Sequence, residues 1–305
     1  MSLYATPSLY RAFFDPSDEM RASIDALVRM HRASPKQARP RRVIDPACGP
    51  ATWLAHFAAQ GATAVGIDIE PKTVAAANVR LAAETKKTTK SESRANVVVG
   101  DMRSPPPSVV GPFDLAINPD NSVGHLGGLA DVAAHLRAMH ALLCDAGPGH
   151  GRSHGAYVVG LAIREPKDSI EAATVYERGP VELEGGGFAA LRSETRGLVD
   201  VKHPDGLRCE RIRHLIMTTG ADGLAPFIVE QYDLLTFPLA TLQSLLSNAG
   251  PWKIVDCRDA TDESLPRKRV EPGCGDVLLV LRPVDAAHAR GGGKRKLASS
   301  RRRAR

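Results

Sequence analysis

The sequence has no apolar run long enough to cross a bilayer. The longest, Ala156 to Ile163, falls far short of the roughly 18 apolar residues that a membrane-spanning helix needs, and it suits a buried strand. The N-terminus lacks both the basic start and the apolar core of a secretory signal. We therefore expect a cytoplasmic protein that neither spans a membrane nor is secreted.

Cysteine is scarce, with five residues among 305. Because five is an odd number and no Cys-x-x-Cys pair occurs, the spacing argues against a disulfide framework and against a zinc site. The ten histidines form no cluster with cysteines or carboxylates at ligand spacing either. We therefore expect no bound metal.

Acidic residues are absent from residues 286–305, which contain eight lysines and arginines. This segment accounts for the net charge of +6, since residues 1–285 alone carry a formal charge of −2. It also contains three consecutive glycines and almost no apolar residue, so we expect a disordered basic tail. Such a tail could contact nucleic acid weakly through phosphates, although no aromatic residue lies among its basic residues to stack on bases.

Short apolar runs alternate with helical patterns through the first half of the chain, which is typical of a parallel sheet with crossover helices. The clearest helical stripe runs from Leu129 to Leu143, with apolar residues at intervals of three and four. Two further helices are expected, one ending near Gly61 and one from Pro71 to about Ala83. The expected strands are 42–45, 62–68, 96–100, 113–118 and 156–163.

The second half has a different pattern. Looser alternation near 189–201, 207–218 and 226–236, interrupted by turn sequences, predicts antiparallel hairpins within an insertion at about 164–236. A helix at about 238–249 and strands at 252–257 and 276–281 follow. The predicted fold is therefore α/β, a doubly wound Rossmann-like sheet of seven strands with an antiparallel insertion before the last helix. We expect one domain over 1–285, which begins with an arm at 1–40.

Three acidic residues stand at the carboxyl ends of expected strands, where doubly wound sheets bind ligands. Asp45 ends the first strand, Asp68 ends the second and Asp101 follows the third. Small residues such as Ala47 and Gly49 follow Asp45, and they let the backbone approach a ligand closely at a helix N-terminus. Asp68 is placed to accept both hydroxyls of a ribose, and Asp101 could hold an adenine amino group. The pattern predicts a nucleotide site.

The turn Asp45-Pro46-Ala47-Cys48-Gly49-Pro50-Ala51 resembles the first motif of class I S-adenosylmethionine-dependent methyltransferases, acid-x-Gly-x-Gly-x-Gly. The acid and the central glycine match, whereas both outer glycines are alanine. Val65-Gly66-Ile67-Asp68 is similar to the family's ribose-binding segment, and Gly100-Asp101-Met102 to its adenine-binding segment. The resemblance implies S-adenosyl-L-methionine as cofactor, bound by Asp45, Ala47, Cys48, Gly49, Asp68, Ile69, Asp101, Met102 and Asn118.

Further segments resemble the small-molecule branch of that family, including the glycine and sarcosine N-methyltransferase type. They are residues 3–10, the antiparallel insertion, the exit Asp120-Asn121-Ser122 and the turn Ala249-Gly250-Pro251-Trp252. The resemblance covers roughly residues 3–283. It implies methyl transfer to an amine or hydroxyl of a small molecule, with the N-terminal arm closing over the cofactor.

An activated methyl group needs little covalent help, so catalysis would rest on positioning in a water-poor pocket. A base is required only if the nucleophile arrives protonated, and His125 and Asp120 are the candidates. Tyr10, in the arm, is a further candidate for the pocket. The insertion would line the substrate pocket with Arg211, Arg213, His214 and Tyr232.

Several alternatives remain open. Asp68 could hold the ribose of a nicotinamide cofactor, although the turn keeps one glycine of that fingerprint, Gly-x-Gly-x-x-Gly. Asn118-Pro119-Asp120-Asn121 resembles the Asn-Pro-Pro-aromatic motif of methyltransferases that act on bases or amides, but Asn121 cannot stack on a flat target. The others are a methyltransferase acting on nucleic acid or protein, and a non-catalytic nucleotide-binding module docked by its tail.

Overall fold

The computed structural model describes most of the chain between residues 6 and 284. The described residues are 6–31, 39–85, 94–144, 155–166, 168, 174–183, 186–198, 203, 205–220, 223–224 and 228–284. The expected basic tail at 286–305 lies outside them, so its disorder and its contact with nucleic acid stay predictions. No helix in the described ranges is long and apolar enough to span a membrane.

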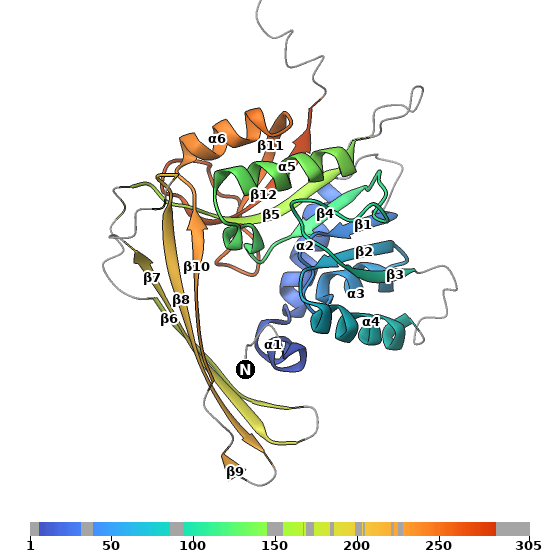
Figure 1. Ribbon diagram of the computed structural model, residues 1–305, viewed down its shortest axis with the longest axis vertical. Helices are drawn as coiled ribbons and strands as arrows, with labels where there is room; N and C mark the ends of the chain where they lie inside the picture. Colours follow the sequence, from blue (N-terminus) through green and yellow to red (C-terminus); the bar gives the residue numbers. More distant parts are fainter. Residues whose placement is uncertain are drawn as a thin grey trace, which may run out of the picture.

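The larger sheet has seven strands in the order β11-β12-β5-β4-β1-β2-β3 (Figure 1). The first five strands along the chain run parallel, whereas β12 is antiparallel to β5 and β11 to β12. This confirms the expected Rossmann-like sheet. The strands are β1 (Arg42–Asp45), β2 (Thr63–Asp68), β3 (Ala95–Val99), β4 (Leu115–Asn118), β5 (Ala156–Ile163), β11 (Trp252–Asp259) and β12 (Gly275–Pro283).

Helices cover both faces of this sheet, because its strands are apolar on both sides. Side chains of α5 and α6 pack on the face that includes Ile44, whereas α2 and α3 pack on the face that includes Val43. The helix α4 packs beside α3 at the β2–β3 edge. The helices are α1 (Pro7–Phe14), α2 (Asp18–Met30), α3 (Thr52–Ala59), α4 (Pro71–Thr85), α5 (Leu129–Leu143) and α6 (Leu239–Asn248), with the 3₁₀ helix η1 (Ser122–His125).

The insertion between β5 and α6 forms a second, antiparallel sheet in the order β10-β8-β7-β6, with β9 paired to β8. It stands beside the larger sheet, and its long strands extend past it (Figure 1). The three expected strands are present, but β6 was not predicted. The strands are β6 (Thr174–Glu182), β7 (Phe188–Leu198), β8 (Arg208–Gly220), β9 (Gly223–Leu224) and β10 (Ile228–Thr236).

The strand β6 lacks a sequence signal because it is an exposed edge strand. Almost all of its residues are exposed, so no apolar alternation marks it, and Gly179-Pro180 interrupts it at a shift in register. Proline is tolerated there because an edge strand leaves one row of N–H groups unpaired.

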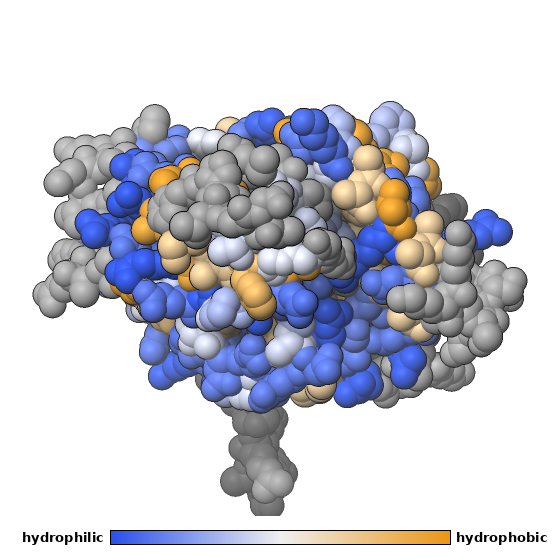
Figure 2. All heavy atoms as spheres, turned by 90° about the horizontal axis from the view of Figure 1, so that it is seen from below, coloured by the Kyte–Doolittle hydropathy of each residue, from blue (hydrophilic) through white to orange (hydrophobic). Residues whose placement is uncertain are grey.

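Figure 2 shows the molecule from below, where the described part of the face is mainly hydrophilic with small separate apolar groups.

Charged side chains fix the root of the smaller sheet to the larger one. The guanidinium of Arg164, just after β5, donates to Glu210 Oε1 at 2.8 Å and to Asp276 Oδ2 at 3.1 Å. Glu165 Oε1 accepts from the N–H of Leu239 at 2.9 Å, at the start of α6. Glu210 is 6% exposed, so its charge depends on Arg164 for compensation.

The N-terminal helix α1 bridges the two sheets (Figure 1). Arg178 in β6 donates to the carbonyl of Phe13. At the other side, Thr52 Oγ1 donates to Asp15 Oδ1 at 2.5 Å, at the start of α3. A small apolar cluster joins α1 to the smaller sheet, formed by Leu9, Phe13, Ala189, Leu191 and Ile216.

Candidate functional site

The carboxyl ends of β1 and β2 meet at one edge of the larger sheet. Asp68 Oδ2 accepts from the N–H of Gly49, and its Oδ1 from the N–H of Glu70, both at 2.9 Å. Asp45 is 3% exposed and accepts from the N–H of Ala47 at 3.2 Å. Asp68 thus ties the β1–α3 loop to the end of β2, and each carboxylate retains lone pairs for a ligand.

The β1–α3 loop leaves space in front of its backbone. Gly49 has a φ of 51°, and a Cβ added there would meet nothing within 4 Å. Ala51 also has a positive φ, 62°, and stands directly before α3. The Cys48 side chain points into the core, where burial raises the thiol pKa, and its N–H bonds to Ile67 O at 2.9 Å. Of the expected contacts in this loop, Gly49 therefore offers the most open approach.

An unsatisfied acceptor lies beside Asp45. Asn118 ends β4 with 2% exposure, and its amide group hydrogen-bonds to Asp45. Its Oδ1 is buried and has no hydrogen-bond partner among the described residues. Burial raises the pKa of Asp45 well above its usual range, and the negative charges of Asp120 and Asp68 add to the rise. A buried acceptor without a partner fits a ligand that brings an N–H donor.

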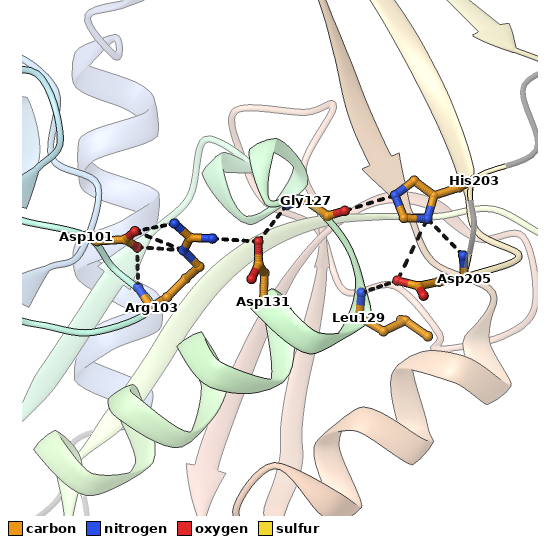
Figure 3. Close-up of polar contacts among 7 residues, drawn as sticks. All are labelled: Asp101, Arg103, Gly127, Leu129, Asp131, His203 and Asp205. Atoms are coloured by element: carbon orange, nitrogen blue, oxygen red, sulfur yellow. Dashed lines mark hydrogen bonds and ion pairs between the residues drawn. The ribbon is translucent and has the colours of Figure 1, made fainter.

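The side of the site nearest β3 combines an apolar side chain with an ion pair. Ile69 directly follows Asp68 and is 72% exposed. The Asp101 carboxylate accepts two hydrogen bonds from Arg103 Nε, at 3.0 and 2.9 Å, and this guanidinium lowers the pKa of Asp101. Arg103 also donates to Asp131 in α5 at 2.7 Å (Figure 3). Arg103 was not predicted, and it restricts the geometry with which Asp101 can bind an adenine.

Met102 is fixed through its backbone. Its carbonyl accepts from Nδ1 of His135 at 3.1 Å, and Nε2 of His135 lies 2.8 Å from the Tyr157 hydroxyl. Burial lowers the pKa of His135 to about 4, so this imidazole is neutral at physiological pH. The expected cofactor contact at Met102 therefore rests on a rigid backbone.

A chain of polar contacts continues from Asp131 to the smaller sheet (Figure 3). Asp131 accepts from the N–H of Gly127 at 3.2 Å, and His203 Nε2 donates to the carbonyl of Gly127 at 3.0 Å. Asp205, between β7 and β8, accepts from the N–H of Leu129 at 2.7 Å. The residue before α5, Gly128, has no side chain to cap the helix. Asp205 takes over this role from the segment between β7 and β8.

Replacing Asp205 with alanine is expected to lower the free energy of unfolding by about 1 kcal/mol, because an N-terminal N–H of α5 loses its acceptor. Urea unfolding followed by circular dichroism measures this. Asp205→Asn keeps an acceptor oxygen and should retain most of the stability. Equal unfolding midpoints for Asp205→Ala and the wild type would show that the cap contributes nothing.

Asp120 lies at the exit of β4 and receives a hydrogen bond from the indole of Trp53 in α3. Its side chain remains accessible to water, yet protein atoms surround it on most sides. This partial desolvation raises the pKa of Asp120 to about 6, with the charge of Asp15 adding to the rise. Asp120 can therefore change its charge near physiological pH.

Tyr10 in α1 connects Asp120 with the smaller sheet. Its ring lies 5.0 Å from that of Phe14, and its hydroxyl feels the negative charges of Asp120 and Asp45 as well as Tyr232. Burial, followed by these neighbours, raises the pKa of Tyr10 well above its usual range. Tyr10 stays a neutral phenol, and two of the three candidate catalytic residues, Tyr10 and Asp120, are brought together.

The remaining candidate, His125 in η1, faces β10. Its ring centroid lies 4.9 Å from that of Tyr232, whose hydroxyl is 2.9 Å from His214 Nε2. Phe14 packs on His214 from α1 at 5.6 Å. Burial lowers the pKa of both histidines, while the charge of Glu230 opposes the shift. Two neutral imidazoles and a phenol thus face the same space as Tyr10.

Two expected contacts lie on the other face of the smaller sheet. Side chains alternate along a strand, so Arg211 and Arg213 project away from His214. Arg211 forms a bidentate pair with Asp233 on that face, at 2.7 and 2.9 Å. These arginines do not face the candidate site, which corrects the expectation from sequence.

Sequence reasoning missed Trp53, Glu230 and Phe14. Trp53 lies in the apolar sequence of α3, and only its indole N–H distinguishes it from a core residue. Glu230 and Tyr232 stand two positions apart on β10, and side chains two apart on a strand lie on the same face. The sequence could therefore have placed both on one face. Within the described ranges, no group of three or more histidines, cysteines and carboxylates is arranged to hold a metal.

Comparison with known proteins identifies the domain type. Residues 43–147 match a family model described as a methyltransferase domain. No curated protein sequence matches the chain significantly.

Solved structures match nearly the whole chain. An S-adenosylmethionine-dependent methyltransferase from Clostridium acetobutylicum has a TM-score of 0.64 at 11% identity, covering 91% of this chain and 96% of that one. CalS10, an amino pentose methyltransferase from Micromonospora echinaspora, has 0.60 at 19%, covering 93% and 98%. The sugar N-methyltransferase KedS8 from Streptoalloteichus has 0.59 at 21%, covering 90% and 91%. At these identities the likeness concerns the fold.

Proposed function

Because the chain is a class I S-adenosylmethionine-dependent methyltransferase, we propose that it methylates the amine nitrogen of a small molecule. The observation that carries this proposal is the acidic and aromatic lining beside the carboxyl edge of the larger sheet, where Tyr10 feels the charge of Asp120 and the Tyr232 ring packs 4.9 Å from that of His125. Acidic and aromatic side chains together favour a cationic or polar amine over an anionic acceptor.

S-adenosylmethionine supplies a methyl group activated by a positively charged sulfur. Five features of the edge fit this cofactor. Asp68 would accept the ribose hydroxyls with its remaining lone pairs, and the exposed Ile69 would cover an adenine face. The unpartnered Oδ1 of Asn118 would accept from an amino group, and the open backbone at Gly49 leaves room for a ligand. Asp101 would bind the adenine amino group while paired with Arg103.

The acceptor side must bind an amine and remove its proton. Asp120 and Glu230 make this side negative, because the neighbouring histidines are neutral, and an ammonium group is attracted to it. Attack requires a free lone pair on nitrogen, so the ammonium proton passes to Asp120 and then to water. Bound S-adenosylmethionine would supply the methyl group for the new N–C bond, and the electron pair of the broken S–C bond would stay on sulfur.

Of two structural neighbours, one is named for an amine-bearing sugar and the other for methyl transfer to nitrogen. One is described as an amino pentose methyltransferase and the other as a sugar N-methyltransferase. Both share the fold of this chain, over 93% and 90% of its length. The glycine and sarcosine type of acceptor, implied by the sequence resemblance, stays a prediction beside them.

Methyl transfer from labelled S-adenosylmethionine to a panel of small molecules tests the proposal. The panel should contain amino sugars, simple alkyl amines, glycine and sarcosine, and hydroxy compounds that lack nitrogen. We expect a mass gain of one methyl group on amines only. Methylation restricted to the hydroxy compounds would overturn the assignment of nitrogen.

The activity is expected to fall as the pH drops through about 6. Above that pH the Asp120 carboxylate is charged and attracts the ammonium acceptor, whereas below it the group is protonated and neutral. A profile of kcat/KM against pH between 5 and 8 measures this limb. Asp120→Asn should remove the limb and lower kcat/KM at pH 8 by roughly tenfold or more. Asp114→Asn, at the amino end of the parallel strands, should keep the acidic limb of the pH profile. If the limb persists in Asp120→Asn, the titrating group is not Asp120.

A further inference from the structure

The face of the smaller sheet that carries His214 changes from apolar to polar along its strands. Near α1 this face is apolar, because Leu191, Ile216 and Ile228 are direct cross-strand neighbours and belong to the cluster that packs on α1. Two residues further along each strand, toward the root of the sheet, the corresponding row is polar. Its members, again direct neighbours, are Ser193, His214 and Glu230. The change thus occurs at the same level on all three strands.

The next row toward the root extends the polar surface. Thr195 on β7 and Tyr232 on β10 stand there, on either side of Ile212 on β8. The two rows together cover about 10 Å across the strands and about 7 Å along them. This area is comparable to one six-membered ring with its substituents. We call these six residues the polar band: Ser193, Thr195, Ile212, His214, Glu230 and Tyr232.

The polar band faces the candidate site. The ring of Tyr232 packs against His125, and Phe14 of α1 packs on His214 at 5.6 Å. The charge of the band belongs to Glu230 and lies on its β10 side, whereas the β7 side offers two neutral hydroxyl groups. An ammonium group is attracted to the charged side. The rest of the acceptor molecule would then extend across the sheet toward β7.

The side chains of Ser193 and Thr195 decide what that part of the acceptor can be. Both residues are half-buried, and within the described residues neither hydroxyl forms a hydrogen bond. A hydroxyl group both donates and accepts, so it complements another hydroxyl group. The band contains no lysine or arginine to compensate a carboxylate or phosphate, and Glu230 would repel either one. The β7 side therefore suits a neutral, hydroxylated part of the acceptor.

We propose that Ser193 and Thr195 are specificity residues that bind hydroxyl groups carried by the acceptor amine. This inference rests on the proposed function and names the class of amine, a hydroxylated one. The enzyme would select such amines over plain alkyl amines, because an alkyl group placed over the two hydroxyls removes them from water without offering a hydrogen bond.

The test compares cyclohexylamine with the three positional isomers of aminocyclohexanol, whose hydroxyl groups sample different places on the band. With the wild type, kcat/KM for the best isomer should exceed that for cyclohexylamine by about tenfold, the size of one hydrogen bond in a desolvated site. Ser193→Ala and Thr195→Val each remove one hydroxyl with little change in side-chain volume. The double variant should lower the ratio of the two kcat/KM values to about one.

Thr218→Val is the matched control. Thr218 is half-buried on the same face of β8, but the apolar row that contains Ile216 separates it from the polar band. This variant should keep the kcat/KM ratio of the wild type. Melting temperature and S-adenosylhomocysteine binding check that each variant is folded and binds the cofactor product, so a changed ratio then reports on the acceptor side.

The outcomes separate this inference from the proposed function. Equal kcat/KM for all four amines with the wild type, or a preference that survives in the double variant, overturns the role of Ser193 and Thr195 while amine methylation stands. If none of the four is methylated, their calorimetric binding to the enzyme loaded with S-adenosylhomocysteine decides. Tighter binding of an aminocyclohexanol that the double variant loses supports the role, whereas equal or absent binding overturns it. If in addition no amine of the wider panel gains a methyl group, the proposed function itself fails.

Discussion

Asp68→Ala is expected to weaken the binding of S-adenosylhomocysteine by roughly 100-fold or more. Two hydrogen bonds from ribose hydroxyls to a carboxylate would be lost, each worth about 1.5–3 kcal/mol when the acceptor is charged. The variant also frees the N–H of Gly49, which Asp68 now holds at 2.9 Å, so the loop loses its attachment to β2. Methyl transfer should fall by at least the same factor at limiting cofactor.

Calorimetric titration with S-adenosylmethionine, S-adenosylhomocysteine and NAD measures this effect. Asp114→Ala is a matched control, because Asp114 also accepts two backbone N–H groups, from Arg41 and Arg42, at 2.8 and 2.9 Å. Asp114 directly precedes β4, beside the amino end of β1, and its variant should lose stability without losing cofactor affinity. Binding of S-adenosylhomocysteine that is unaffected in Asp68→Ala would refute the ribose role.

Arg164→Met is expected to reduce the free energy of unfolding by about 3–5 kcal/mol. The side chain of Glu210 is 8% exposed, and without Arg164 it retains a buried negative charge close to Asp276. Breaking a buried pair from one side costs this much because the remaining charge keeps only the weaker attraction of Arg208. The root of the smaller sheet, and with it the wall that contains His214 and Tyr232, should loosen first.

Chemical unfolding of three variants isolates the cause. Arg164→Met/Glu210→Met removes both charges and should recover most of the lost stability. Arg192→Met breaks two exposed pairs, with Glu177 and Glu194, and should cost at most about 1 kcal/mol. If the double variant is as unstable as Arg164→Met, packing rather than charge explains the loss.

The larger sheet could be predicted closely because its signals are local. The strands β1 and β5 have the predicted bounds, since each is an apolar run closed by polar or turn residues. The acids at the ends of β1 and β2 follow from the same runs, because parallel strands bring their carboxyl ends to one edge. In contrast, β6 has a charged, proline-containing sequence and depends on β7 for its place.

The acceptor side was only partly predictable, for a related reason. Tyr10, Asp120 and His125 were identified from segments beside expected strands, and the structure places His125 against Tyr232 and Tyr10 within the influence of Asp120 and Tyr232. Their catalytic roles stay predictions. Which face of β8 turns inward depends on register and on α1 packing across the sheet, so the sequence alone could not separate His214 from the neighbouring arginines.

The contact of α1 with the smaller sheet also orders events during synthesis. Phe13 leaves the ribosome roughly 200 residues before Ile216, against which its cluster packs. At translation rates of about 5–20 residues per second, α1 waits on the order of 10–40 s for its partner. A helix of eight residues is marginal alone in water. The wall that carries Tyr10 is thus completed only after the smaller sheet has emerged.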